Sequence, residues 1–207
     1  MKFLRNIFSQ LHTFVLWLLI SVLLWAWVFS FLTDTSREKK VMLFAHVGEL
    51  HDRDLTLRLE AHKPEGIKMI KVHDFEYQMI DTSKTFGDLY IVPQSELEQM
   101  LEKDPGAVLE ILDPGDHPTY LFEGRPVGLL AYDAETNCGL GAGSYIFYPS
   151  PEFDGQNYYL CVSSDTLHYP GAEAAVDEAA RAVITDLLTL WEQGPEVPVR
   201  PQTETGD

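Results

Sequence analysis

Apolar residues form one long run, interrupted only by Ser21 and Ser30, and several shorter runs along the chain. The long run extends from Phe14 to Leu32 and contains no charged residue. At about 1.5 Å of rise per residue, a helix of that length crosses the ~30 Å hydrocarbon core of a bilayer. Aromatic rings gather near its C-terminal end, where a membrane interface favours them: Trp25, Trp27, Phe29 and Phe31. The pattern predicts a transmembrane helix over 14–32, preceded by a short tail at 1–13.

Two other interpretations of this run fit less well. A cleaved signal peptide has a shorter apolar region and a small-x-small cleavage site, whereas this run ends in bulky side chains. A buried core helix with this many tryptophans needs a larger protein around it. Basic residues do not decide the orientation, because they flank the run on both sides: Lys2, Arg5, Arg37, Lys39 and Lys40. Long segments translocate largely regardless of charge, so we expect the C-terminal part to lie outside the cytoplasmic membrane.

The shorter runs follow a polar linker at 33–39 and predict an α/β domain over 40–193. Continuous or alternating apolar positions predict strands at 40–47, 67–72 and 89–92. The spacing over 49–62 fits either a helix or an alternating strand, and the stop signal at 64–66 favours the helix. A second helix is expected at 95–103. Ser95 and Glu98 have the spacing of a capping box at the start of the second helix, and a short helical turn is expected at 75–80. Strands that alternate with helices favour a mainly parallel sheet.

The second half of this domain predicts antiparallel hairpins and a closing helix. A turn at 123–125 separates apolar runs at 119–122 and 126–132, which is a hairpin signature. Loops are expected at 137–143 and 149–157, and further strands at 144–148 and 158–163. Apolar spacings of three and four predict a helix over 173–193, with a stripe of Val176, Ala180, Val183, Leu187 and Trp191. The tail at 194–207 contains prolines but no apolar run, which predicts disorder.

Charge and cysteine content exclude several classes of protein. The chain carries 32 Asp and Glu against 15 Lys and Arg, a formal charge of −17. Nucleic acid is therefore not an expected partner, because phosphate binding needs a basic surface. Two cysteines are too few for a disulfide-framework miniprotein or a four-cysteine zinc site. Outside the membrane, Cys138 and Cys161 either form a disulfide or remain as one buried and one surface thiol.

No motif in the chain identifies a reaction, a metal or a cofactor. One cluster has zinc-binding residue types, but its spacing matches no compact site and solvated surface residues explain it better: His46, His51, Asp52, Asp54 and His62. The glycines from Gly139 to Gly143 lack the G-x-G-x-x-G spacing. Residue types used by hydrolases occur without a G-x-S-x-G elbow: Ser163, Ser164, Asp165 and His168. We therefore expect a protein without enzymatic activity.

Polar residues at the ends of two expected strands predict a ligand groove. His73 and Asp74 follow the strand at 67–72, while Asp88 and Gln94 flank the strand at 89–92. In an open parallel sheet, ligands bind in the crevice beyond the carboxyl ends of the strands. These four residues are the candidate rim of such a groove. The alternative is that the aspartates only cap helices and bond turns.

Three sequence segments have a familiar order. They are KVMLFAHV at 40–47, IKMIKVHDFEYQMIDTS at 67–83 and GDLYIVPQSELEQML at 87–101. Together with YLFEGRPVG at 120–128, they resemble the first lobe of extracellular solute-binding proteins, which have the type II periplasmic-binding fold. The resemblance covers roughly 40–191 and implies the fold of one lobe. Proteins of that family bind solute between two lobes, so this chain resembles a membrane-anchored, truncated form.

Together these features favour a membrane-tethered, extracytoplasmic interaction or accessory module that is non-enzymatic and associated with a transporter or envelope complex. Its expected partners are the membrane, through Phe14 to Leu32, and a protein of the envelope. One alternative is a residual solute-binding receptor with a small-molecule groove at the strand ends. The other alternative, with the weakest support, is an envelope hydrolase.

Overall fold

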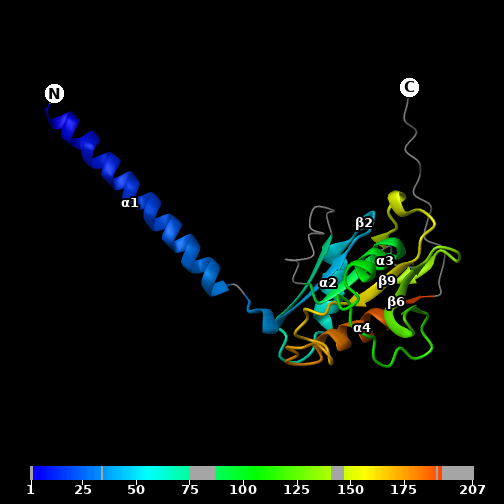
Figure 1. The fold of residues 1–207 in the computed structure, drawn as a ribbon. Coiled ribbons are helices and arrows are strands. Elements are labelled where there is room, and N and C mark those ends of the chain that lie inside the picture. Colours follow the sequence, from blue (N-terminus) through cyan, green and yellow to red (C-terminus); the bar gives the residue numbers. More distant parts are fainter. Residues whose placement is uncertain (1, 34, 75–86, 141–146, 190, 193–207) are drawn as a thin grey trace, which may run out of the picture. The chain divides into compact units, whose positions relative to one another are not determined.

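The computed structural model describes residues 2–33, 35–74, 87–140, 147–189 and 191–192. By its contacts the chain divides into two compact units, Met1–Ser36 and Arg37–Asp207. The first unit consists of the helix α1 (Lys2–Thr33), drawn in blue in Figure 1. Its segment Leu11–Phe29 is long and apolar enough to cross a membrane, and among the described residues it is the one segment that meets this criterion.

The second unit is built around a mixed sheet. Three strands run parallel in the order β3-β1-β4, with bounds Met69–Asp74, Lys40–Ala45 and Leu89–Pro93. The strand β9 (Tyr158–Val162) lies antiparallel between β4 and β6 (Arg125–Asp133). Beyond β6 the antiparallel strands are β5 (Thr119–Phe122), β7 (Cys138–Leu140) and β10 (Trp191–Glu192). The expectation of a mainly parallel sheet is therefore wrong, because most strand pairs in the described residues are antiparallel.

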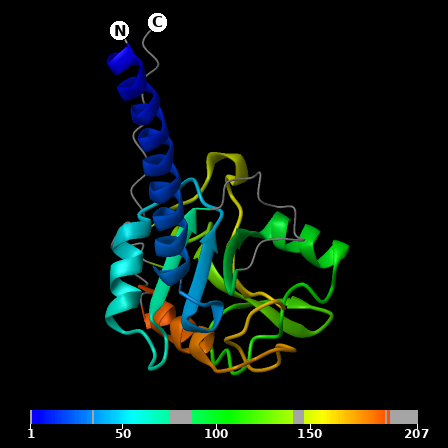
Figure 2. The ribbon, with the colours of Figure 1, turned by 90° about the vertical axis from the view of Figure 1, so that its left-hand side faces the viewer.

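Helices cover both faces of this sheet. Figure 2 shows α2 (Asp52–Ala61) and α4 (Ala179–Thr189) on one side and α3 (Gln94–Lys103) on the other. Side chains of β4 alternate between the two cores: Leu89 and Ile91 pack in the α2 and α4 core, and Tyr90 packs in the α3 core. Burial on both faces is why the central strands have nearly continuous apolar sequences. The domain is thus an α/β structure in three layers.

Shorter elements complete the described part of the second unit. A 3₁₀ turn, η1 (Arg37–Lys39), leads into β1, and another, η4 (Pro151–Phe153), precedes β9. The strands β2 (Glu49–Leu50) and β8 (Phe147–Tyr148) form a separate antiparallel pair. Three expectations lie wholly or partly outside the described residues: the turn at 75–80, the first part of the strand at 144–148, and the disordered tail.

Two helix starts differ from the sequence-based expectation. Pro93 is the N-cap of α3 and makes no side-chain cap bond, while the Ser95 N–H donates to Gln156 Oε1, so the expected capping box is wrong. The last helix begins at Ala179, whose N–H donates to Asp177 Oδ1. Val176 lies before this helix and is 56 % exposed. An acceptor side chain just before a helix fixes its start more strongly than apolar spacing does.

The expected loop at 137–143 and the end of the expected last helix are both partly strand. Gly139 pairs with Tyr132 of β6 and with Glu192 of β10, while Trp191 lies in β10 rather than on a helix. A Cβ at Gly139 would lie only 2.6 Å from the carbonyl oxygen of Ala131. This glycine therefore allows two strands to approach closely, which is a recognised use of glycine inside a strand.

Candidate functional site at the carboxyl end of the sheet

The connections after β1 and β4 leave the sheet in different directions. The chain passes from β1 through α2 to β3, on one side of β1, whereas β4 lies on the other side and leads directly into α3. Because α2 and α3 cover opposite faces, the carboxyl ends of β1 and β4 form a topological switch point. Open α/β sheets bind their ligands at such points. The side chains at these two strand ends are therefore the first candidates for a site.

A buried histidine–glutamate pair occupies this position. His46 directly follows β1, and its N–H donates to the Ile91 carbonyl at 2.8 Å. Glu96 is in the first turn of α3, and its Oε2 lies 2.7 Å from His46 Nδ1. Their side chains are only 10 % and 11 % exposed. The edge of the imidazole also contacts the Phe153 ring, with centroids 5.1 Å apart.

The surroundings of His46 favour its cationic form. The hydrogen bond to Glu96 raises the pKa of His46, and this effect exceeds the lowering by burial. The negative charges of Glu96, Glu152 and Asp74 raise that pKa further. The net result is a pKa above the ordinary histidine value of 6.5. These surroundings therefore favour an imidazolium at His46 in direct contact with the Glu96 side chain.

An open hollow of about 570 Å³ lies where α3 begins and β6 ends. Its size is within the range of roughly 300–1,000 Å³ that small-molecule sites occupy. Amide and acidic side chains predominate among its lining residues, which are Gln94, Ser95, Glu98, Asp133, Ala134, Glu135, Gly155, Gln156 and Asn157. The hollow thus offers both hydrogen-bond donors and acceptors beside the first turn of α3.

Hydrogen bonds fix the orientation of two amide side chains in this hollow. Gln156 Oε1 accepts the Ser95 N–H at 3.1 Å, and Asn157 Oδ1 accepts the Ala134 N–H at 2.9 Å. Because these backbone groups are donors, the atoms that face them must be the amide oxygens. Within the described part of the chain the amino groups of Gln156 and Asn157 form no hydrogen bond, and they remain as donors for a ligand.

The structure brings three of the four expected rim residues to the carboxyl end. His73 and Asp74 lie opposite Phe44 and Ala45 at the end of β1, with the His73 ring stacked on Phe44 at 5.5 Å. Gln94 lines the hollow. Asp88 lies at the other end of β4, where it is 2 % exposed and accepts hydrogen bonds from the Met42 N–H and the Thr166 hydroxyl. It is therefore a buried structural residue in this fold.

Sequence reasoning missed the central pair of the site. His46 was grouped with surface residues, although it is 8 % exposed; His51 and His62 are exposed as expected. Glu96 was not considered at all. A histidine that directly follows a buried strand, and an acid in the first turn after the adjacent strand, would have been the signal. Among the described residues there is no group of three side chains placed to hold a metal ion.

The two thiols and the serine–histidine segment have separate structural positions. Cys138 and Cys161 lie on β7 and β9 with β6 between these strands, and they are not joined to each other. The disulfide is therefore not formed in this structure. Burial raises the pKa of the Cys161 thiol. His168 bonds Asp177 and two backbone carbonyls, so within the described chain its ring has no recorded contact with Ser163 or Ser164.

Comparison with known proteins adds no relative. The chain matches no model of a protein family, and neither curated proteins nor solved structures provide a match. The resemblance to one lobe of solute-binding proteins therefore stays a prediction, and the geometry of the site has to support any functional proposal.

Proposed function

We propose that the protein is a membrane-tethered, extracytoplasmic interaction module, without enzymatic activity, that accompanies a transporter or another envelope complex. We place its contact surface at the carboxyl end of the sheet. The observation that carries this proposal is the open hollow beside α3, where hydrogen bonds hold Gln156 and Asn157 with their amino groups unused. A rim whose side chains are already oriented binds a partner with less loss of conformational freedom.

The tether is supported by α1 and by the distribution of charge. Large apolar side chains along Leu11–Phe29 are exposed, and insertion into a bilayer would remove them from water. Residues 33–207 carry 32 acidic and 13 basic residues, so this part is repelled by anionic lipid. A domain that is tethered by a membrane helix but repelled by the lipid surface stays accessible to other envelope proteins. This arrangement supports the proposed interaction module.

The chemistry of the hollow favours a protein segment as the occupant. The lining contains amide side chains together with the carboxylates of Glu98, Asp133 and Glu135, and both kinds of group can pair with a peptide backbone. Carboxylates at a rim also favour a partner segment that carries basic residues. We therefore expect an extended, neutral or basic segment of an envelope protein.

A small polar solute is the second candidate. The volume of the hollow is sufficient for one, and His73, Asp74 and Gln94 lie at the same end of the sheet. The resemblance to one lobe of solute-binding proteins points the same way. A receptor of this kind would bind sugars, amino acids or short peptides without a macromolecular partner.

Crosslinking of the full chain in its own membrane tests the module. A photoreactive amino acid at the exposed Glu135, on the rim, is compared with one at the exposed Glu123, in the turn at the opposite end of β6. We expect a discrete protein adduct from position 135 and none from position 123. Equal adducts from both positions, or none from either, would contradict the proposed contact surface.

Thermal melting of the full chain in detergent distinguishes the second candidate. A panel of sugars, amino acids and short peptides is screened, with a chelator control. A shift of several degrees with one solute class would favour the receptor, because a ligand that binds only the folded state stabilises it. The module predicts no shift with any small solute.

Cysteine labelling tests the side of the membrane. We expect a membrane-impermeant maleimide to label Cys138 in intact cells, because this residue is partly exposed, and to leave the buried Cys161 unlabelled. A Cys138→Ser variant should lose the label. Labelling that appears only after the cells are broken would place the domain inside.

A further inference from the structure

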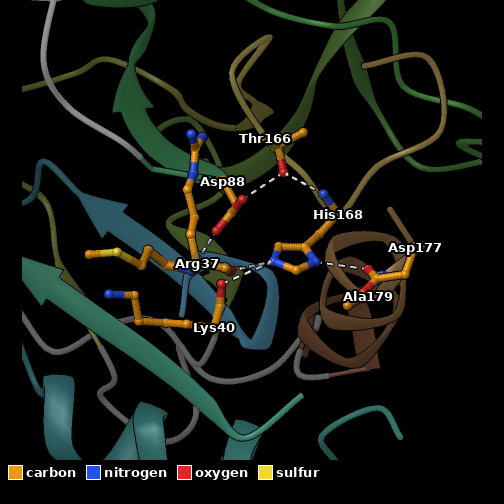
Figure 3. A network of polar contacts seen from close by, with 8 residues as sticks. Arg37, Lys40, Asp88, Thr166, His168, Asp177 and Ala179 are labelled. Carbon is orange, nitrogen blue, oxygen red and sulfur yellow. Dashed lines mark hydrogen bonds and ion pairs between the residues drawn. The ribbon is translucent and has the colours of Figure 1, made fainter. Parts of the chain in front are cut away.

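A second buried histidine lies at the amino end of the sheet, away from the hollow. The side chain of His168 has no exposed surface. Its Nδ1 is 2.8 Å from Asp177 Oδ1, and its Nε2 is 3.1 Å from the carbonyl oxygens of both Arg37 and Lys40 (Figure 3). One ring therefore joins the segment just before α4 to the segment Arg37–Lys40, which follows α1 along the chain.

The contacts of this ring determine its protonation state. A neutral imidazole has one N–H donor and one acceptor nitrogen, whereas an imidazolium has two donors. Both nitrogens of His168 face oxygen atoms that only accept hydrogen bonds. Every contact is satisfied only when the ring is cationic. A neutral ring would leave one nitrogen lone pair directed at a carbonyl or carboxylate oxygen inside a buried site, which is unfavourable.

The charged groups around the ring support the cation. Asp177 bonds the ring, and Asp88 lies behind it, bonded to the Thr166 hydroxyl at 2.7 Å. The same hydroxyl accepts the His168 N–H at 3.1 Å. The cationic ends of Arg37 and Lys40 point away from the imidazole in Figure 3. The anions therefore lie closer to the ring than the cations do.

Other bonds hold the same segment in place. The Arg37 guanidinium donates to the Asp165 carbonyl. Asp88 Oδ2 accepts the Met42 N–H at 2.8 Å, and the Asp88 N–H donates to the Met42 carbonyl at 2.9 Å. These contacts fix β1 itself. The Lys68 N–H donates to the Lys39 carbonyl at 2.8 Å. The carbonyls of Arg37 and Lys40 share His168 Nε2 as a donor, so this ring acts on the two ends of the segment.

We propose that His168 is a pH-operated latch, which as an imidazolium holds the segment Arg37–Lys40 against the domain and releases it when the ring loses its proton. The latch consists of His168, Asp177 and the two carbonyls. It acts on the connection between α1 and the domain and does not depend on what binds at the hollow. A closed latch gives a short, stiff connection, and an open latch gives a longer and more compliant one.

The direction of the pH effect follows from the surroundings of the ring. Burial lowers the pKa of His168, but the hydrogen bonds that the ring donates to Asp177 and to the Arg37 carbonyl, with the charges of Asp88 and Asp177, outweigh burial and raise it above 6.5. A raised pKa means that the latch is fully closed below the ordinary value of 6.5 and opens as the pH rises through the raised value.

Limited trypsin digestion of the full chain in nanodiscs tests the latch. Cleavage after Arg37 and Lys39 reports the segment, and cleavage after Lys103, at the end of α3, is the reference at each pH. We expect the ratio of the two to rise severalfold between roughly pH 6 and pH 9, because the ring loses its proton as the pH passes through its raised pKa. A ratio that does not change with pH would overturn the proposal.

Three variants sharpen this test. His168→Gln should give a high ratio that is independent of pH. Asp177→Asn, at a side chain 41 % exposed, should move the rise to lower pH because it removes a charge that raises the pKa of His168. His62→Gln, at a side chain 70 % exposed, is the matched control and should keep the wild-type profile. If His168→Gln does not fold, the Asp177→Asn variant alone tests the latch. A cleavage ratio that rises over the same pH range as in the wild type would then contradict the proposal.

Nitrogen NMR of histidine-labelled full chain gives a direct measurement. At about pH 6, both ring nitrogens of His168 should carry protons, and the signals should be absent from His168→Gln. A neutral tautomer at that pH would overturn the proposal, whatever the digestion shows.

Discussion

Each end of the sheet holds a buried histidine that contacts a carboxylate, and the two pairs are built differently. At the carboxyl end, His46 and Glu96 contact each other through side chains, beside the ring of Phe153. At the amino end, His168 bonds a carboxylate on one side and two backbone carbonyls on the other. The side chains of His46 and Glu96 retain some exposure, whereas that of His168 has none.

The difference indicates which end is suited to binding and which to structural support. A side-chain pair can change rotamers without moving a strand, and this pair is close to the hollow. His168 bonds the backbone carbonyls of Arg37 and Lys40, and Asp88 bonds the nearby Met42 N–H of β1. This ring therefore cannot change its position without a shift of the backbone. The buried histidine at the amino end therefore ties the chain before β1 to the segment before α4, while the pair at the carboxyl end joins the end of β1 to the first turn of α3.

The largest expected effect is at the amino end. Asp88→Ala removes the acceptor of the Met42 N–H and of the Thr166 hydroxyl and leaves both unsatisfied. We expect the free energy of unfolding to fall by about 3 kcal/mol or more. Denaturation of the full chain in detergent, followed by near-ultraviolet circular dichroism, measures it. Asp116→Ala, at an exposed position, is the control, and equal losses in the two variants would contradict the structural role of Asp88.

A smaller and pH-dependent effect is expected at the carboxyl end. Glu96→Gln removes the main cause of the raised pKa of His46. The ion pair stabilises the fold fully below 6.5, and this contribution is lost as the pH rises through the raised pKa. The variant should therefore lose about 1–2 kcal/mol near pH 6 and less near pH 9. A loss that grows with pH in the same denaturation measurement would exclude the proposed ion pair.

The smallest effect is expected from a third pair, on the surface. His62 Nδ1 lies 3.6 Å from Asp186 Oδ2, and the His62 side chain is 70 % exposed. Water and salt weaken such a pair, so His62→Gln should change the free energy of unfolding by less than about 0.5 kcal/mol. If His62→Gln lowered the free energy of unfolding as much as Glu96→Gln does, burial would not explain the different contributions of the three pairs to stability.

The sequence predicted best those elements whose signal is local. Strands β1, β3 and β4 are apolar runs with a helix after β1 and after β4, and the hairpin of β5 and β6 surrounds a turn at Glu123 and Gly124. The start of α4 was placed too early because it depends on Asp177, and the strand β7 was taken for a loop because of its glycine. Strand direction was wrong for the sheet as a whole, since β9 enters the middle from a distant part of the sequence.

The candidate site was predictable only in part, for the same reason. Residues that follow a parallel strand lie at its carboxyl end, which placed His73 and Asp74 correctly. Asp88 precedes its strand, so the direction of β4 puts it at the opposite end. His46 and Glu96 are fifty residues apart, and nothing local indicates that they meet. Their contact depends on β1 and β4 being neighbours, which is a property of the tertiary fold.

The central position of β9 has a consequence for the order in which the chain acquires structure. The strands β3, β1 and β4 come first in the sequence, and β5, β6 and β7 follow, yet β9 is the strand that joins these two groups. While the chain is being synthesised or translocated, β4 keeps an unpaired hydrogen-bonding edge until Val162 has emerged. An open edge of apolar strand pairs readily with other chains. A chain that stalls or is cut before β9 is therefore expected to aggregate rather than to form a smaller stable domain.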